Sequence, residues 1–322
     1  MFRRRRRKKP RLLQWCTLSV LWMTIVILMA IGLAIQTLGI ADKKSHTQKV
    51  EKVMAKETFY FSILRNPVTL AESSFTYYKG TSAAFKKVDS LEQFLRDPWR
   101  YYSARERGNQ YARNLMWFDF GFDHNSNDTA DYVELVLKEI RSTFHLILLS
   151  EYFDESMILL KDALCWEFDD VVSFKLNFRS DVTVRRLSEE AVRRVKAWNA
   201  LDWKLYLHFN HTFWQKVESY GQQRMRSDVR VLREKRRKLM DLCLQGSKPV
   251  EASQIQDKNI KPFQYGRAQI MGYNLNSNLD NSTREKCLRM VMPELQYKDL
   301  LDAKLFPPTP TTKSQQQLEV HF

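Results

Sequence analysis

Apolar and polar positions divide the chain into segments with different expected structures. Residues 12–40 form a long apolar run without a single charge. A β-rich run at 59–64 is followed by a helical pattern that Pro67 can open, because proline is favoured in a first helical turn. A second apolar run, 144–149, precedes another helical pattern at 155–165. This repetition of strand and helix predicts an α/β fold with a parallel sheet flanked by helices.

The rest of the pattern is mostly helical. Residues 131–140 predict a helix, and 171–176 predict a third strand. Asp154 stands where it can cap the helix at 155–165. From 188 to 244 helical periodicity is combined with dense charge, which is typical of solvated helix faces, although attraction of acidic lipids or an anionic donor is the alternative.

The apolar run at 12–40 exceeds the roughly 20 residues that span a bilayer, so we expect a transmembrane signal anchor. Eight Lys and Arg residues between positions 3 and 11 precede it, within a net charge of +15. Because positive charge favours the cytosolic side, the expected topology is single-pass type II with a lumenal domain, as in Golgi membrane enzymes. A cleaved signal peptide is the alternative, since residues 39–41 resemble a cleavage site. The adjoining uncharged run argues against nucleic-acid binding.

We therefore divide the chain into five parts. They are a basic cytosolic tail at 1–11, the anchor at 12–40, a short stem at 41–57, a lumenal domain at 58–300 and a tail at 301–322. The tail is rich in Pro, Thr and Gln and is expected to be disordered, because it cannot bury enough apolar surface to fold.

Two features fit a lumenal, oxidising compartment. Acceptor sequons for N-glycosylation occur at Asn127, Asn210 and Asn281. We pair Cys243 with Cys287 because they flank a loop-rich segment, although spacing alone does not fix the pairing. The remaining lumenal cysteine, at position 165, is expected to stay buried in its helix.

The candidate chemistry lies where the first strand meets its helix. Arg65 ends the strand, and Ser73 follows eight residues later in the helical pattern. A cation and a hydroxyl beside a helix N-terminus can bind a phosphate together with the unpaired backbone N–H groups there. The alternative is structural, with Arg65 paired to a nearby carboxylate and Ser73 half buried in the helix.

The segment Arg65-Asn-Pro67, with Ser73 behind it, resembles the 3′-phosphate-binding motif of sulfotransferases that use the donor PAPS. Further stretches resemble the galactose 3-O-sulfotransferase family in the same order along the chain. They are Phe118-Asp-Phe-Gly-Phe-Asp123, residues 144–156, Leu160-Lys-Asp-Ala-Leu-Cys-Trp166, Phe174-Lys-Leu-Asn177 and Ala197-Trp-Asn-Ala-Leu-Asp202. Residues 255–257, 270–275 and 292–297 favour a member that acts on galactosylceramide.

The resemblance implies a sulfotransferase-like P-loop fold and transfer of sulfate from PAPS to the 3-hydroxyl of galactose. Arg65 and Ser73 would then hold the 3′-phosphate of the donor, and no metal is expected. The implied partners are galactosylceramide or another glycolipid with terminal galactose, the Golgi membrane, and a second copy of the chain if the protein is a homo-oligomer.

One part of the family pattern has no counterpart. Related enzymes place a strand and a loop of the form Lys-Thr-His-Lys-Thr before the Arg-Asn-Pro motif, and this loop cradles the 5′-phosphosulfate. Here the nearest sequence is residues 43–47, without a preceding apolar strand. We therefore expect a fold that lacks the first strand and this loop, and we assign no catalytic residue. The alternative function is an inactive or truncated membrane-anchored protein that binds partners.

Three other groups have both functional and structural interpretations. Glu151 and Asp154 can act as an acid–base pair, although capping and ion pairing explain them more simply. His208 and His211 are spaced as metal ligands, but no cysteine or carboxylate completes the set. The aromatic residues at 99–102 can stack on a sugar or pack in the core.

Overall fold

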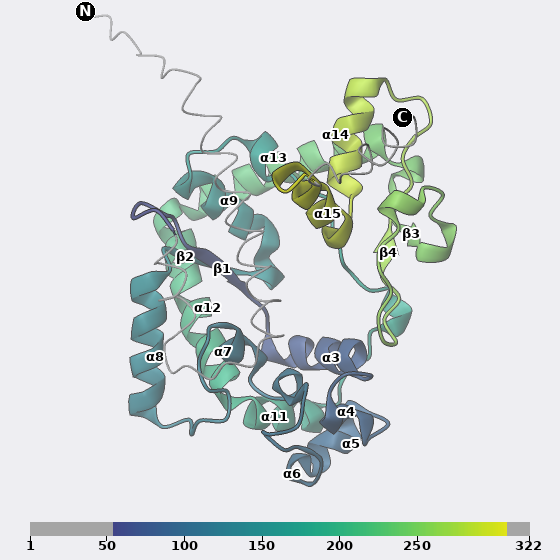
Figure 1. Cartoon of the computed structure of the whole chain (residues 1–322). Coiled ribbons are helices and arrows are strands. Elements are labelled where there is room, and N and C mark those ends of the chain that lie inside the picture. Colours follow the sequence, from purple (N-terminus) through teal and green to yellow (C-terminus); the bar gives the residue numbers. More distant parts are fainter. Residues whose placement is uncertain (1–53, 308–322) are drawn as a thin grey trace, which may run out of the picture. The chain divides into compact units, whose positions relative to one another are not determined.

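The computed structural model describes residues 54–307 (Figure 1). Its central element is a parallel pair of strands, β1 (Phe61–Leu64) and β2 (Leu146–Leu149). Phe61 lies opposite Leu146, and Leu64 lies opposite Leu149. All four residues of β2 are buried, which explains why this strand appears in the sequence as an unbroken apolar run rather than as an alternating pattern.

Each of the two strands leads into a helix. β1 is followed by α3 (Pro67–Tyr78), whose first residue is the proline expected there. β2 is followed by a 3₁₀ turn, η2 (Ser150–Tyr152), and by α9 (Phe153–Ala163). The α/β class with a small parallel sheet flanked by helices is therefore confirmed.

The other elements are mostly helices. Between β1 and β2 the chain forms α4 (Ala83–Lys86), α5 (Leu91–Arg96), α6 (Pro98–Tyr101), η1 (Asn109–Ala112), α7 (Leu115–Asp119) and α8 (Ala130–Thr143). After α9 come α10 (Phe168–Val171), η3 (Asp181–Thr183), α11 (Glu189–Trp198), α12 (Ala200–Tyr220) and α13 (Gln222–Cys243). The C-terminal part contains η4 (Gln245–Ser247), β3 (Val250–Glu251), η5 (Ala252–Gln254), η6 (Lys258–Ile260), β4 (Met271–Gly272), α14 (Asn281–Val291) and α15 (Glu294–Leu305).

The core around the parallel strands is built by α8, α9, α12 and α13. Leu64, Leu148 and Leu149 are almost fully buried there, together with Ile158 of α9 and Leu205 of α12. A second cluster of buried apolar residues joins α3, α4, α5 and α11, and a third surrounds the C-terminal part.

The basic stretch of α13 is used mainly for ion pairs. Arg233 and Arg236 each donate to Asp154 of α9 at 2.6 Å, while Lys235 contacts Asp169 and Lys238 contacts Glu234. The prediction that Asp154 caps α9 is therefore wrong, because it lies inside the first turn and pairs with α13 instead.

The structure corrects three further predictions. No strand forms at 171–176, because Val171 ends the short helix α10 and the next carbonyls accept from side chains rather than from a neighbouring strand: Ser173 O from Arg236 and Lys175 O from Tyr273. Cys165 is exposed rather than buried, since α9 ends at Ala163 and leaves it in a left-handed turn with φ of 54°. Finally, α15 continues through Leu305, past the expected start of the disordered tail at 301.

Some predictions concern residues outside the described part of the chain. They are the cytosolic tail at 1–11, the anchor at 12–40, the stem up to residue 53, including 43–47, and the tail from 308 onward. Within residues 54–307, no helix combines the length and apolar character that a membrane span requires.

Candidate functional site

The candidate site lies where β1 and β2 end. Arg65 and Asn66 directly follow β1, and Glu151 follows β2 by two residues. Because the strands are parallel, both of these ends lie at the same edge of the sheet. Ligands of open α/β sheets bind outside the carboxyl ends of the strands, so this edge is where a ligand is expected.

Arg65 is held in place without being neutralised. Its Nε donates to Thr69 Oγ1 at 3.2 Å, and its backbone N contacts Met116 Sδ at 3.5 Å. Among the described residues, no carboxylate forms an ion pair with its guanidinium. Burial lowers the pKa of Arg65, and the nearby charge of Glu151 opposes that shift. The alternative prediction, in which Arg65 pairs with a nearby carboxylate, is therefore wrong.

The turn between β1 and α3 is fixed by two hydrogen bonds of Asn66. Its side-chain Oδ1 accepts from Val68 N at 2.9 Å and so caps α3. Its backbone N donates to Glu151 Oε1 at 2.7 Å. Glu151 lies in η2 and is exposed, and through this bond it holds the peptide that carries Arg65.

Ser73 lies in the middle of α3 rather than at its N-terminus, because the helix already begins at Pro67. Thr69 and Ser73 are four residues apart and therefore share one helix face, next to the bonded Arg65. Ser73 is half buried, and its hydroxyl makes no hydrogen bond to any residue in 54–307. By contrast, the hydroxyl of the adjacent Ser74 donates to Tyr111 O at 2.6 Å.

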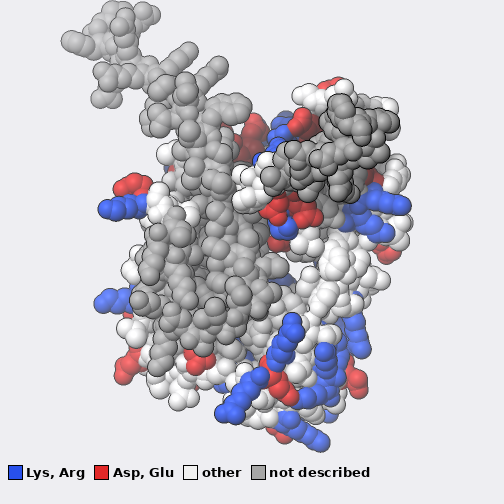
Figure 2. Space-filling model, in the orientation of Figure 1, with Lys and Arg blue, Asp and Glu red and all other residues white. Residues whose placement is uncertain are grey.

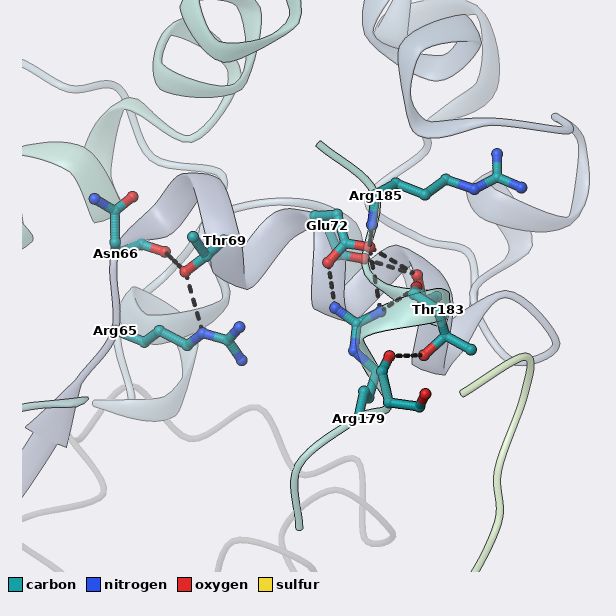
Figure 3. A network of polar contacts seen from close by, with 9 residues as sticks. Arg65, Asn66, Thr69, Glu72, Arg179, Thr183 and Arg185 are labelled. Atoms are coloured by element: carbon teal, nitrogen blue, oxygen red, sulfur yellow. Dashed lines mark hydrogen bonds and ion pairs between the residues drawn. The ribbon is translucent and has the colours of Figure 1, made fainter. Parts of the chain in front are cut away.

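A second polar group lies farther along α3, as Figure 3 shows. Glu72 pairs with Arg179 through both carboxylate oxygens, and each side chain is only 8% exposed. Glu72 Oε1 also accepts from the backbone N of Arg185, while Arg179 donates to Thr183 O. This buried pair ties the segment at 179–185 to α3. Removing one partner of such a pair typically costs about 3–5 kcal/mol.

The motif at 197–202 holds residues 112–117, the segment whose Met116 contacts the backbone N of Arg65. Trp198 Nε1 donates to Ala112 O at 2.6 Å, and Asn199 Oδ1 accepts from the backbone N of residue 114 at 2.8 Å. Asp202 Oδ1 accepts from Trp117 N at 2.8 Å, and its Oδ2 accepts from Met116 N at 3.2 Å, which caps α7. Burial raises the pKa of Asp202 to about 7, although both N–H bonds favour the charged form.

The described histidines do not belong to a group of metal ligands. His145 precedes β2, at the opposite end of the strands, and its Nδ1 accepts from Tyr60 N at 3.1 Å. His208 lies 3.4 Å from Arg141, and its neighbour at 211 joins no set of ligands. Within the described ranges, no group of three or more His, Cys, Asp or Glu residues is arranged to hold a metal ion.

The family of the chain follows from the sequence comparisons. The sequence model of the galactose-3-O-sulfotransferase family matches residues 39–305. The chain belongs to the galactose-3-O-sulfotransferase family. No solved structure matches it.

Three relatives illustrate the range of similarity within the galactose-3-O-sulfotransferase family. Galactose-3-O-sulfotransferase 2 of Mus musculus is 51% identical over 261 residues, which cover 80% of this chain and 66% of the relative. Galactose-3-O-sulfotransferase 4 of Homo sapiens is 38% identical, with coverages of 81% and 68%. Galactosylceramide sulfotransferase of Bos taurus is 42% identical, with coverages of 81% and 63%. The chain therefore spans roughly two thirds of the length of these relatives.

The galactose-3-O-sulfotransferase motifs explain part of the geometry. Of the two residues named from the motif, Arg65 precedes α3 and bonds Thr69, and Ser73 lies one turn beyond Thr69 in the helix. Nothing in the sequence singled out Thr69 or the bond from Asn66 to Glu151. The only sequence signal for Asp202 was its place in the stretch 197–202.

The remaining predicted groups have separate positions in this galactose-3-O-sulfotransferase family member. Cys243 and Cys287 form a disulfide that joins α13 to α14. Asn127 is exposed in the loop before α8, Asn281 is exposed at the start of α14, and Asn210 is half buried on α12.

The aromatic group at 99–102 is divided between surface and core. Trp99 is 63% exposed, whereas Tyr102 is buried. The guanidinium of Arg113 lies 4.7 Å from the ring centre of Trp99 and 4.8 Å from that of Trp198. This side of Trp99 is therefore already covered by a cation.

Proposed function

We propose that this chain transfers sulfate from PAPS to the 3-hydroxyl of galactose. The observation that carries the proposal is Arg65, a cation without a carboxylate partner at the carboxyl edge of the parallel strands. Its Nη groups can bind a phosphate through two parallel hydrogen bonds, as guanidinium groups do with such anions. The free hydroxyl of Ser73 lies farther along the same helix face and supplies a neutral donor.

The residues around Arg65 fit the 3′-phosphate of the donor. Thr69 orients the guanidinium through its Nε, while Asn66 and Glu151 fix the turn that carries it. PAPS supplies the activated sulfuryl group of the reaction. In this arrangement the described residues hold and orient the nucleotide end of the donor.

The acceptor in this proposal is galactosylceramide or another glycolipid with terminal galactose, as the C-terminal sequence motifs favour. Relatives named galactose-3-O-sulfotransferase 2 share more identical residues with the chain than those named galactosylceramide sulfotransferase. A galactose-terminated oligosaccharide is therefore the second acceptor to test. We also propose that the protein is a Golgi membrane protein of type II topology, with its catalytic domain in the lumen.

The deciding experiment measures PAPS-dependent sulfate transfer by the full-length chain in detergent, with galactosylceramide and lactose as acceptors. In parallel, binding of PAP, the desulfated donor, is titrated to the unmodified chain and to Arg65→Ala. We expect Arg65→Ala to weaken PAP binding by at least tenfold, since a charge-assisted bidentate contact is lost, which corresponds to about 1.4 kcal/mol.

One control variant and two possible outcomes decide between the alternatives. Arg230→Ala removes an exposed arginine from α13 and should leave PAP binding unchanged. Equal PAP affinity of Arg65→Ala and the unmodified chain would refute the assignment of the donor site. PAP binding without sulfate transfer to either acceptor would instead support the alternative, an inactive member that retains the scaffold and binds partners.

A further inference from the structure

A cavity of about 270 Å³ lies beside α3, and its lining includes neither Arg65, Thr69 nor Ser73. Glu72, Thr76 and Lys79 contribute one wall, and the start of α5 contributes another through Asp89 and Glu92. The remaining walls come from the segment at 182–187 and from the loop that contains Arg267. The buried pair of Glu72 and Arg179 keeps the segment in position.

The loop with Arg267 is fitted closely against α3. Gly266 has φ of 62°, and a Cβ at this position would lie 2.5 Å from Tyr77 O, so only glycine is accommodated without movement. Tyr265 packs against Tyr77, with ring centres 4.8 Å apart, and its hydroxyl bonds Thr81. Arg267 is therefore carried to the cavity by a defined loop.

Among the basic side chains around the cavity, one has hydrogen-bond partners and three have none among the described residues. Lys79 Nζ is already bonded to the carbonyls of Phe85 and Val88, so it contributes charge more than free donors. The exposed side chains of Arg185, Arg186 and Arg267 make no hydrogen bond or ion pair within the described part of the chain. Figure 2 shows Lys and Arg side chains gathered over this region of α3, α4 and α11.

The wall at the start of α5 is acidic. Asp89 and Glu92 form no ion pair with any described residue, and they offer acceptors for hydroxyl groups. A ligand with several phosphates would meet these carboxylates at a cost. By contrast, a molecule with one acidic group and many hydroxyls would satisfy both walls, and Phe75 and Leu91 add apolar surface for the carbon face of a sugar ring.

We propose that this cavity binds an acidic saccharide through a sulfate or carboxylate group. Arg186 and Arg267 would hold the anionic group, and Asp89 and Glu92 would accept from the sugar hydroxyls. The residues of this cavity differ from those of the proposed donor site, and the proposal does not depend on whether the chain transfers sulfate.

The test titrates the full-length chain with three saccharides, namely lactose sulfated at the 6-hydroxyl of galactose, sialyllactose and neutral lactose. We expect both acidic sugars, or one of them, to bind at least tenfold more tightly than lactose. The two acidic probes distinguish a sulfate from a carboxylate as the preferred group. Inorganic sulfate serves as a further probe, and binding as tight as that of the sugars would overturn the saccharide assignment.

The matched variants are Arg186→Ala combined with Arg267→Ala, and Arg230→Ala as the control on α13. The double variant should lose at least tenfold in affinity for the acidic sugar while its affinity for PAP stays unchanged. If PAP affinity falls in parallel, the cavity belongs to the donor site and the proposal is wrong. Lack of selectivity for acidic over neutral sugars would also refute the proposal, whatever the result for sulfate transfer.

Discussion

Single side chains at the edge of the parallel strands determine what the site can bind. Arg65 keeps its charge available because its neighbours hold it by the Nε and by the backbone, not through an opposing carboxylate. The resemblance in the sequence was enough to select Arg65 and Ser73. It could not reveal the bond between Asn66 and Glu151, because these residues are 85 positions apart and meet only through strand pairing.

Glu151 provides a test in which hydrogen bonding and charge have opposite effects. Glu151→Ala removes the acceptor for Asn66 N, so the Arg65 turn loosens and PAP affinity should fall by roughly tenfold, or about 1.4 kcal/mol. Glu151→Gln keeps an acceptor oxygen and removes a negative charge near the bound phosphate. PAP should therefore bind to the Gln variant at least as tightly as to the unmodified chain, as calorimetric titration can measure. Equal losses in both variants would contradict this positioning role.

At the scale of elements, the sequence predicted those strands and helices whose position depends on local apolar patterns. The runs at 59–64 and 144–149 gave the two parallel strands, and Pro67 marked the start of α3. The predicted strand at 171–176 was wrong because the backbone there has no partner strand, and its carbonyls bond the side chains of Arg236 and Tyr273 instead. The hydrogen bonds that Asn199 and Asp202 accept from residues 114 and 117 could not be predicted from local patterns, because the partners lie about 85 residues earlier in the chain.

Asp202 predicts a pH dependence of stability. Burial raises its pKa in the folded state to about 7, above its value of about 3.9 in an unfolded chain. The folded state therefore binds more protons between these values, and the free energy of unfolding should decrease as pH rises from about 4 to 7. Burial also raises the pKa of Asp119 to about 7, so Asp202→Asn should reduce this decrease, as denaturant unfolding at pH 5 and pH 7.5 would show. An identical slope in both proteins would exclude Asp202 as its source.

Two glycines near α3 allow a matched test of the loop that carries Arg267. Gly266→Ala should destabilise the fold by about 1–3 kcal/mol, because the left-handed φ and the contact with Tyr77 O both oppose a Cβ. Gly80→Ala should be close to neutral, since no atom lies within 4 Å of the added Cβ. Thermal or denaturant unfolding of both variants measures the difference. A neutral Gly266→Ala would mean that the loop moves freely off α3.

At the scale of the whole described part, the disulfide between Cys243 and Cys287 joins elements 44 residues apart. Closing a loop of this length stabilises a protein by about 4 kcal/mol in the chain-entropy description. Changing both cysteines to serine should therefore lower the free energy of unfolding by about 2–4 kcal/mol, as denaturant titration would measure. Cys165→Ser is the control, because this exposed thiol is unbonded and its loss should change little. Equal stability of both variants would contradict the role of the disulfide.

The helix α3 contributes residues to both proposed sites. Thr69 and Ser73 belong to the proposed donor site, whereas Glu72, Thr76 and Lys79 line the proposed saccharide cavity. If binding of either molecule shifts this helix, the two ligands become heterotropic effectors. Thermodynamic reciprocity then requires that the factor by which the saccharide changes donor affinity equals the factor by which the donor changes saccharide affinity.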